Sequence, residues 1–215
     1  MSPRSTTCRR APESDRPAGR PPAEAPAAAG TGALDRPGGT RASDEATRLL
    51  GDLLRALGVP ETDLDPRVLR AAVHALGTLT RGYGEHPQHV VGDALFRVGS
   101  TEPVAVREIP FVSLCAERVL PFQGRAHVVY LPGDRVVGLS KIARLVDLYA
   151  ARLQTPGRLA DGLAHAVSST LGARGVSVRI EARYVGPGAS GVVRAGSDLG
   201  DFRLPVWRER LGWMF

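Results

Sequence analysis

Hydrophobic residues recur at helical spacing in the first half of the folded part of the chain. Over residues 43–57 and 66–79, leucine, valine and alanine return every three or four positions, which is the period of one face of an α-helix. Asp65 followed by Pro66 provides a capping side chain and a proline in the first turn of the second stretch. The pattern predicts two amphipathic helices there and a weaker helical turn over residues 86–94.

Beyond residue 100 the spacing changes to the alternating or continuous apolar runs that are typical of strands. The predicted strands are 104–115, 126–131, 136–139, 176–182 and about 191–195. Between them, residues 140–154 and 156–171 have helical spacing. The order of helices, antiparallel strands, two helices and further strands indicates an α+β fold. Because so small a sheet leaves strand edges to be paired or covered, we expect an oligomer.

The N-terminal residues have a different composition. Residues 1–42 are rich in Pro, Ala, Gly and Arg and hold almost no large apolar side chain, so we expect a disordered tail. We expect an N-terminal helical region over 43–98 and the sheet-and-helix domain over 99–215. No run approaches the ~18 apolar residues of a membrane span. The arginines near the start have no apolar block behind them, so no secretory signal is predicted and a cytoplasmic location is expected.

The chain is basic, with a formal net charge of +6 and a pI of about 10.1. The arginines are scattered, and no basic stripe is interleaved with aromatic residues, so an anionic small ligand is favoured over nucleic acid. Lys141 is the only lysine in the chain. A lysine that persists in so arginine-rich a chain is a candidate for a task that the planar, permanently charged guanidinium cannot perform, although it could also be a chance survivor at the surface.

Two segments carry a resemblance to a known family. Residues 108–122 read Glu-Ile-Pro-Phe-Val-Ser-Leu-Cys-Ala-Glu-Arg-Val-Leu-Pro-Phe, and residues 137–146 read Val-Gly-Leu-Ser-Lys-Ile-Ala-Arg-Leu-Val. Both are similar to signature segments of the GTP cyclohydrolase I family, and the likeness covers roughly residues 44–198.

The resemblance implies the tunnelling fold, or T-fold: N-terminal helices, then an antiparallel sheet with a helix pair, in a barrel closed by oligomerisation into a pentamer or decamer. It also implies sites between neighbouring subunits and a purine or pterin ligand. For the family it implies conversion of GTP to dihydroneopterin triphosphate in pterin and folate biosynthesis.

The positions of the family's zinc ligands are altered in this chain. The resemblance places them at Cys115, Arg118 and Gly186, where the family has Cys, His and Cys. A catalytic zinc needs about three protein ligands and an open position, and one ligand does not provide this. We therefore expect no cofactor and no zinc bound in the family manner. Cys115 is then most simply a small buried hydrophobic residue.

Other family positions are replaced by titratable or neutral residues. Glu117 and Tyr184 stand where the family has two site histidines, so acid/base chemistry remains open to them. Glu117 beside Arg118 is equally compatible with an inert ion pair. The family's guanine-binding Gln-Glu pair corresponds to Pro156-Gly157, which supplies no carboxylate to hydrogen-bond the base.

The family's phosphate-binding positions are largely retained. Ser140, Lys141 and Arg144 match three of them, and Ser140 lies at a predicted helix start, where backbone N–H groups favour an anion. A further phosphate-contacting arginine of the family corresponds to Ser190.

Three hypotheses follow. The first is a repurposed, metal-independent enzyme that acts on a phosphorylated or anionic, nucleotide-like small molecule at a subunit interface, with Glu117, Tyr184 and Lys141 as catalytic candidates. The second is a non-catalytic paralogue that binds such a ligand as a homo-oligomer or co-assembles with an intact cyclohydrolase. The third is a true GTP cyclohydrolase I with a rebuilt metal site that uses Cys115 and Glu117.

Overall fold

The structure is a computed structural model and describes residues 39–97, 102–186 and 191–212. The expectation of a disordered tail concerns residues that lie, apart from 39–42, outside these ranges, and so does the expectation for Ser190. No helix in the described ranges combines the length and the hydrophobicity that a membrane-spanning segment requires.

Both N-terminal helices are present. Helix α1 spans Gly39–Ala56 and helix α2 spans Pro66–Thr80. The Asp65 side chain accepts a hydrogen bond from the backbone N–H of Arg67 at 2.7 Å, so the predicted cap is confirmed. Helix α1 begins four residues before the expected start, because Thr40–Ala42 contain no proline or glycine that would end it.

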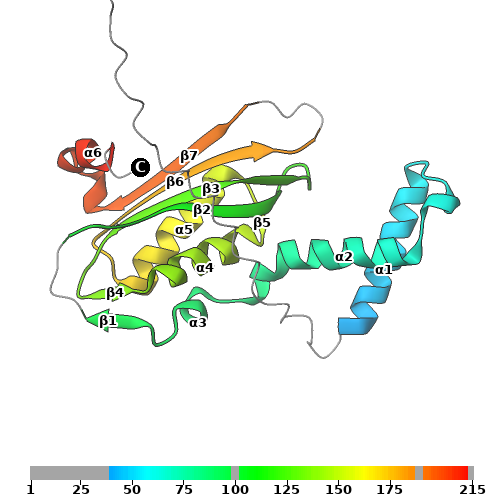
Figure 1. Ribbon diagram of the computed structural model, residues 1–215, viewed down its shortest axis with the longest axis horizontal. Helices are drawn as coiled ribbons and strands as arrows, with labels where there is room; N and C mark the ends of the chain where they lie inside the picture. Colours follow the sequence, from blue (N-terminus) through cyan, green and yellow to red (C-terminus); the bar gives the residue numbers. More distant parts are fainter. Residues whose placement is uncertain (1–38, 98–101, 187–190, 213–215) are drawn as a thin grey trace, which may run out of the picture. The chain divides into compact units, whose positions relative to one another are not determined.

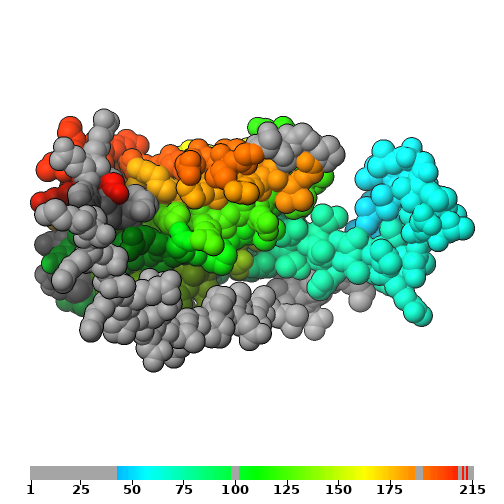
Figure 2. Space-filling model, turned by 45° about the horizontal axis from the view of Figure 1, so that its top comes forward, coloured from blue at the N-terminus to red at the C-terminus, as the bar shows by residue number. Residues whose placement is uncertain are grey.

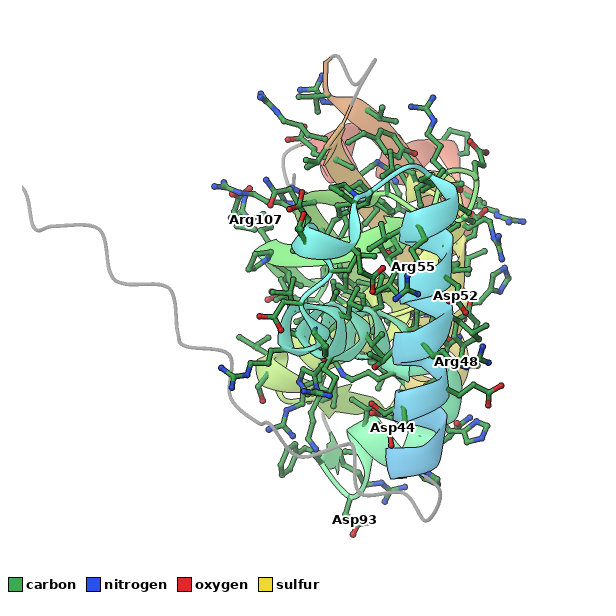
Figure 3. The ribbon with its side chains drawn as sticks, turned by 90° about the vertical axis from the view of Figure 1, so that its right-hand side faces the viewer. Asp44, Arg48, Asp52, Arg55, Asp93 and Arg107 are labelled. Atoms are coloured by element: carbon green, nitrogen blue, oxygen red, sulfur yellow. The ribbon has the colours of Figure 1, made fainter. Side chains whose placement is uncertain are left out.

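A row of ion pairs follows the exposed side of α1. Arg48 and Arg55 both contact Asp52, at 3.3 and 2.9 Å, and all three side chains are labelled in Figure 3. Arg55 also donates two hydrogen bonds to Glu61, at 2.7 and 2.9 Å, and these bonds hold the pKa of Glu61 below its usual value. The pairs link α1 to the short 3₁₀ turn η1 (Glu61–Asp63) that precedes α2.

An antiparallel sheet with strand order β5-β2-β3-β6-β7 forms the centre of the remaining fold. Its strands are β2 (Val104–Cys115), β3 (Pro121–Leu131), β5 (Leu153–Gln154), β6 (Gly175–Tyr184) and β7 (Val193–Gly200). Only β5 is parallel to its neighbour, pairing with the last two residues of β2. A separate two-stranded sheet joins β1 (Leu95–Arg97) to β4 (Arg135–Val137).

Helices α4 (Leu139–Ala150) and α5 (Pro156–Leu171) lie against one face of the sheet (Figure 1). Alternate residues of β3 face them: Phe122, Ala126, Val128 and Tyr130 are fully buried in the shared core. The remaining elements are shorter. They are η2 (Arg81–Gly84), α3 (Pro87–Val91), η3 (Asp201–Arg203) and α6 (Pro205–Gly212).

The structure differs from the sequence-based expectation after α4. The helix predicted for residues 140–154 ends at Ala150, and Leu153–Gln154 form β5 instead. The backbone N–H of Ala116 donates to the carbonyl of Gln154 at 2.8 Å, and Ser113 Oγ donates to the carbonyl of Arg152 at 3.1 Å. Pairing with β2 therefore outweighs the helical spacing of this segment. Strand β1 and helix α6 were not predicted.

The sheet face turned away from α4 and α5 is polar over much of its area, and β3, β6 and β7 lie side by side on it (Figure 2). Arg179 donates to both carboxylate oxygens of Asp198, at 2.7 and 3.0 Å, and Arg194 pairs with Glu181 at 2.7 Å. Near the end of the same face, Phe202 covers Val129 and Leu131 in a small second core.

Both outer edges of the sheet are open in the described residues. Strand β5 covers only Leu114 and Cys115, so residues 104–113 of β2 have a partner strand on one side only, and β7 pairs only with β6. Open edges of this length are the kind of surface that pairing between subunits would cover, as expected from the small sheet.

Candidate functional site

The turn after β2 brings several of the predicted site residues together. The backbone N–H of Cys115 donates to the carbonyl of Leu120, and that of Val119 donates to the carbonyl of Cys115, both at 2.8 Å. Val119 has φ +54°, a left-handed conformation that closes the turn. Glu117 and Arg118 occupy the middle of this turn and are both exposed. The turn is thus fixed by backbone bonds while its two charged side chains stay accessible.

Tyr184, at the end of β6, lies beside this turn. The guanidinium carbon of Arg118 is 5.8 Å from the centroid of the Tyr184 ring, and the ring packs against Phe122 at 5.3 Å. Burial, together with the nearby Cys115 thiol and Glu117 carboxylate, raises the pKa of Tyr184 above its usual value, and Arg118 opposes this in part. The Tyr184 hydroxyl therefore stays protonated at neutral pH, where it is able to donate a hydrogen bond.

The ion pair between Glu117 and Arg118, which the sequence left open, does not form within the part of the chain that the structure describes, where neither side chain has a salt bridge. Arg118 faces the Tyr184 ring instead. We call the group formed by Cys115, Glu117, Arg118, Tyr184 and Gly186 the Cys115 corner.

Gly186 completes the corner. The backbone N–H of Val185 donates to the carbonyl of Pro121 at 3.1 Å, and a Cβ added at Gly186 would lie 3.2 Å from Leu120 Cδ1. Gly186 therefore lies next to the turn after Cys115. Its φ of +133° belongs to a region that residues with a side chain rarely adopt. The backbone at this position is arranged for glycine rather than for a metal-binding side chain.

The donor set of the corner does not fit the zinc arrangement that the resemblance implies. Of its three corresponding positions, only Cys115 carries a metal donor, and it is buried. Among the described residues, no three or more His, Cys, Asp and Glu side chains are grouped so that they could hold a metal ion.

The N-terminus of α5 is near the same corner. The Thr155 side chain accepts from the backbone N–H of Arg158 at 3.3 Å, and Pro156 is the first helical residue, as predicted. Gly157 follows, and a Cβ added there would meet no atom within 4 Å. Three residues earlier, the carbonyl of Gln154 accepts from Ala116 in the turn. The position that the resemblance assigns to a guanine-binding carboxylate is thus open space.

The three predicted anion-binding residues lie at the start of α4, and we call them the anion trio. Ser140 and Arg144 are exposed, and Lys141 is half-buried. The Lys141 ammonium donates to the carbonyl of Val90 at 2.9 Å, at the end of α3. An ammonium has three donors, so two remain for an anion. No sequence pattern indicates this contact, since any residue at position 90 provides a backbone carbonyl.

Within the chain the trio and the Cys115 corner lie at opposite ends of α4. The helix runs from Leu139 to Ala150, and its last residues lead into β5 beside Cys115. At 1.5 Å per residue, Ser140 and Ala150 are about 15 Å apart along the helix axis. The sequence-predicted residues therefore form two groups: Cys115, Glu117, Arg118 and Tyr184 in one, and Ser140, Lys141 and Arg144 in the other.

Comparisons with known proteins find a matching family and several relatives. The family model described as GTP cyclohydrolase I matches residues 50–199. A protein from Campylobacter lari named GTP cyclohydrolase 1 is 47% identical over 119 residues, and the match covers 55% of this chain and 63% of that relative. A relative of the same name from Deinococcus radiodurans is 39% identical over 151 residues, covering 70% of each chain. The apo structure of an archaeosine synthase QueF-Like overlaps with a TM-score of 0.42 at 22% identity, covering 47% of this chain and 96% of that chain.

The strand and helix order β2-β3-α4-α5-β6-β7, with the helix pair on one face of an antiparallel sheet, defines an α+β protein of the tunnelling-fold class. The family match covers more than half of the sequence. The chain belongs to the GTP cyclohydrolase I family.

Proposed function

We propose that this family member does not carry out zinc-dependent hydrolysis and instead acts, without a metal, on a phosphorylated or anionic small molecule bound between subunits. The observation that carries the proposal is the composition of the Cys115 corner. A guanidinium at Arg118 and a glycine at position 186 stand where two of three metal donors would be required. Glu117 and Tyr184 are the groups left there for proton transfer.

The anion trio supplies the second part of the proposal. Ser140, Lys141 and Arg144 cluster at the start of a 12-residue helix, where backbone N–H groups add to their attraction for an anion. Because the trio is about 15 Å along α4 from the corner, a small ligand would reach both groups only if they came from different subunits. The open edges of β2 and β7 provide the means of assembly.

Metal content and ligand preference test this function together. We expect purified protein to hold well under one zinc per chain, and its thermal unfolding midpoint to rise with phosphorylated ligands in a screen of nucleotides, pterins and sugar phosphates. Arg144→Gln should abolish the rise, whereas Arg70→Gln, an exposed change on α2, should not. Stoichiometric zinc together with GTP ring opening would replace the proposal with ordinary family chemistry.

A non-catalytic role is the second candidate, and one contact favours it. Lys141, the lone lysine, uses one donor to hold the end of α3 through Val90, which is a structural task. In this case the protein would bind the same ligands without turnover or assemble with an intact cyclohydrolase. Ligand binding without any product in a mass-spectrometric assay of the full ligand panel would favour this role.

A further inference from the structure

Arg118 is an accessible guanidinium held above an aromatic ring. Its position is set by the backbone-bonded turn after Cys115, and its guanidinium carbon is 5.8 Å from the Tyr184 ring centroid. No hydrogen bond or ion pair to a carboxylate engages it within the described ranges. A guanidinium in a cation–π contact keeps its in-plane N–H groups available to form two parallel hydrogen bonds with a planar acceptor.

The start of α5, which is joined to this turn through the Ala116–Gln154 backbone bond, lacks the carboxylate that the family resemblance places there. Gly157 offers no carboxylate, and the space beyond its Cα is open for at least 4 Å. A pocket that binds guanine by its N1–H and N2–H groups must accept hydrogen bonds, whereas a guanidinium can only donate. Arg118 therefore offers a ligand at this corner hydrogen-bond donors and no acceptor.

The rim of the corner is apolar. Val119, Leu120 and Val185 are 58%, 38% and 50% exposed, and the Tyr184 ring lies beside them. Such a rim suits the faces of a flat ring, since apolar contact removes both surfaces from water. A flat ring with an acceptor group on its edge would lie against these side chains and point that group at Arg118.

We propose that Arg118 binds the carboxylate of a planar ring acid, so that the ligand is anionic at both ends. The carboxylate pairs with Arg118 of one subunit, and a phosphate on the same ligand contacts the anion trio of a neighbour. Only the contact between the ligand's phosphate and the anion trio rests on the proposed function. Because a guanidinium has no acceptor, Arg118 cannot pair with the N1–H and N2–H groups of guanine, the edge that a carboxylate would bind.

The test uses the full chain and three probes, with dissociation constants measured by isothermal titration calorimetry. The wild type should bind 4-carboxyphenyl phosphate about tenfold more tightly than the neutral amide 4-carbamoylphenyl phosphate, in keeping with a charge-assisted bidentate pair. R118Q should remove that preference. R183Q, which changes an exposed arginine on the neighbouring strand β6, should keep it.

The outcomes separate this inference from the proposed function. An equal affinity for acid and amide in the wild type, or a preference that survives R118Q, would overturn the role of Arg118. R144Q should weaken both phosphates by the same factor while leaving their ratio unchanged. If neither phosphate binds, the anion trio fails as a phosphate site. Benzoate, the third probe, then tests Arg118 alone. Benzoate binding that R118Q abolishes supports the inference, and no benzoate binding refutes it.

Discussion

The Lys141 ammonium and the Val90 carbonyl are 2.9 Å apart, and this bond joins the first turn of α4 to the last residues of α3. The only lysine of the chain therefore has a structural contact in the same place where the family resemblance gives it a ligand contact. The two roles are compatible, because one N–H is used by the carbonyl and two others remain. They can be separated by measurement.

Lys141→Met is expected to affect both stability and ligand binding. Loss of a half-buried hydrogen bond from a charged donor should lower the free energy of unfolding by roughly 1–2 kcal/mol. Loss of the charge should weaken the binding of tripolyphosphate by at least about tenfold. Urea unfolding at fixed protein concentration and calorimetry measure the two effects.

Arg70→Gln, on the exposed side of α2, is the control for Lys141→Met and should change neither quantity. A stability loss with unchanged tripolyphosphate binding would confine Lys141 to its contact with Val90.

The raised pKa of Tyr184 predicts a loss of stability at alkaline pH. Burial favours the neutral phenol, so the folded protein holds this proton more tightly than the unfolded chain does. The resulting stabilisation is complete below the usual tyrosine pKa of 10.0 and is lost as the pH rises through the higher folded value. Tyr184→Phe should therefore show a shallower decline in stability above pH 10 than the wild type.

Unfolding midpoints at several pH values from 8 to about 11 measure this decline, with a direct titration of tyrosine absorbance beside them. Tyr130→Phe serves for comparison, because burial also raises the pKa of Tyr130, and it lies away from the corner in β3. Identical declines in stability at alkaline pH for the wild type and Tyr184→Phe would contradict the raised pKa of Tyr184.

Much of the fold could be predicted from local patterns. The period of the apolar residues indicated α2 and α5, with the cap of α2 at Asp65 and the start of α5 at Pro156, because capping and amphipathic spacing are properties of a short stretch of sequence. Strand β5 was missed because Leu153–Gln154 continue the helical spacing of α4. Only their pairing with the distant Leu114–Cys115 makes them a strand.

The site was predictable in part. The resemblance placed Cys115, Arg118, Tyr184 and Gly186 in a common site, and the structure brings these four to one corner. The orientation of Arg118 over the Tyr184 ring, rather than toward Glu117, was not predictable. It depends on the turn closed by Val119 at positive φ, which no pattern in the sequence indicates.

Asp198→Asn should destabilise the polar face of the sheet. Asp198 accepts two hydrogen bonds from Arg179 and one from Ser177 Oγ at 2.5 Å, and all three residues are at most half-exposed. An amide in place of the carboxylate weakens these charge-assisted bonds, so we expect a loss of about 1–3 kcal/mol in the free energy of unfolding. Asp161→Asn, an exposed change on α5 at a residue that has no salt bridge to any other described residue, should cost under about 0.5 kcal/mol. Equal losses in the free energy of unfolding for the two variants would show that the Arg179–Asp198 pair contributes nothing specific to stability.

Two glycines give opposite predictions for the same substitution. At Gly124, in the middle of β3, an added Cβ would lie 1.9 Å from the carbonyl oxygen of Glu181 and 2.8 Å from the Cα of Ala182. Backbone atoms of the paired strand β6 cannot move aside without breaking the ladder, so Gly124→Ala should cost at least about 3 kcal/mol or prevent folding.

Gly77 lies inside α2, and an added Cβ there meets no atom within 4 Å. Because alanine restricts the unfolded chain and favours the helix, Gly77→Ala should raise the free energy of unfolding by about 0.5–1 kcal/mol. Thermal unfolding of both variants, with circular dichroism to detect misfolding, tests the pair. A Gly124→Ala variant as stable as the wild type would mean that β3 and β6 are not paired in the register found here, and the placement of Tyr184 beside Phe122 would lose its support.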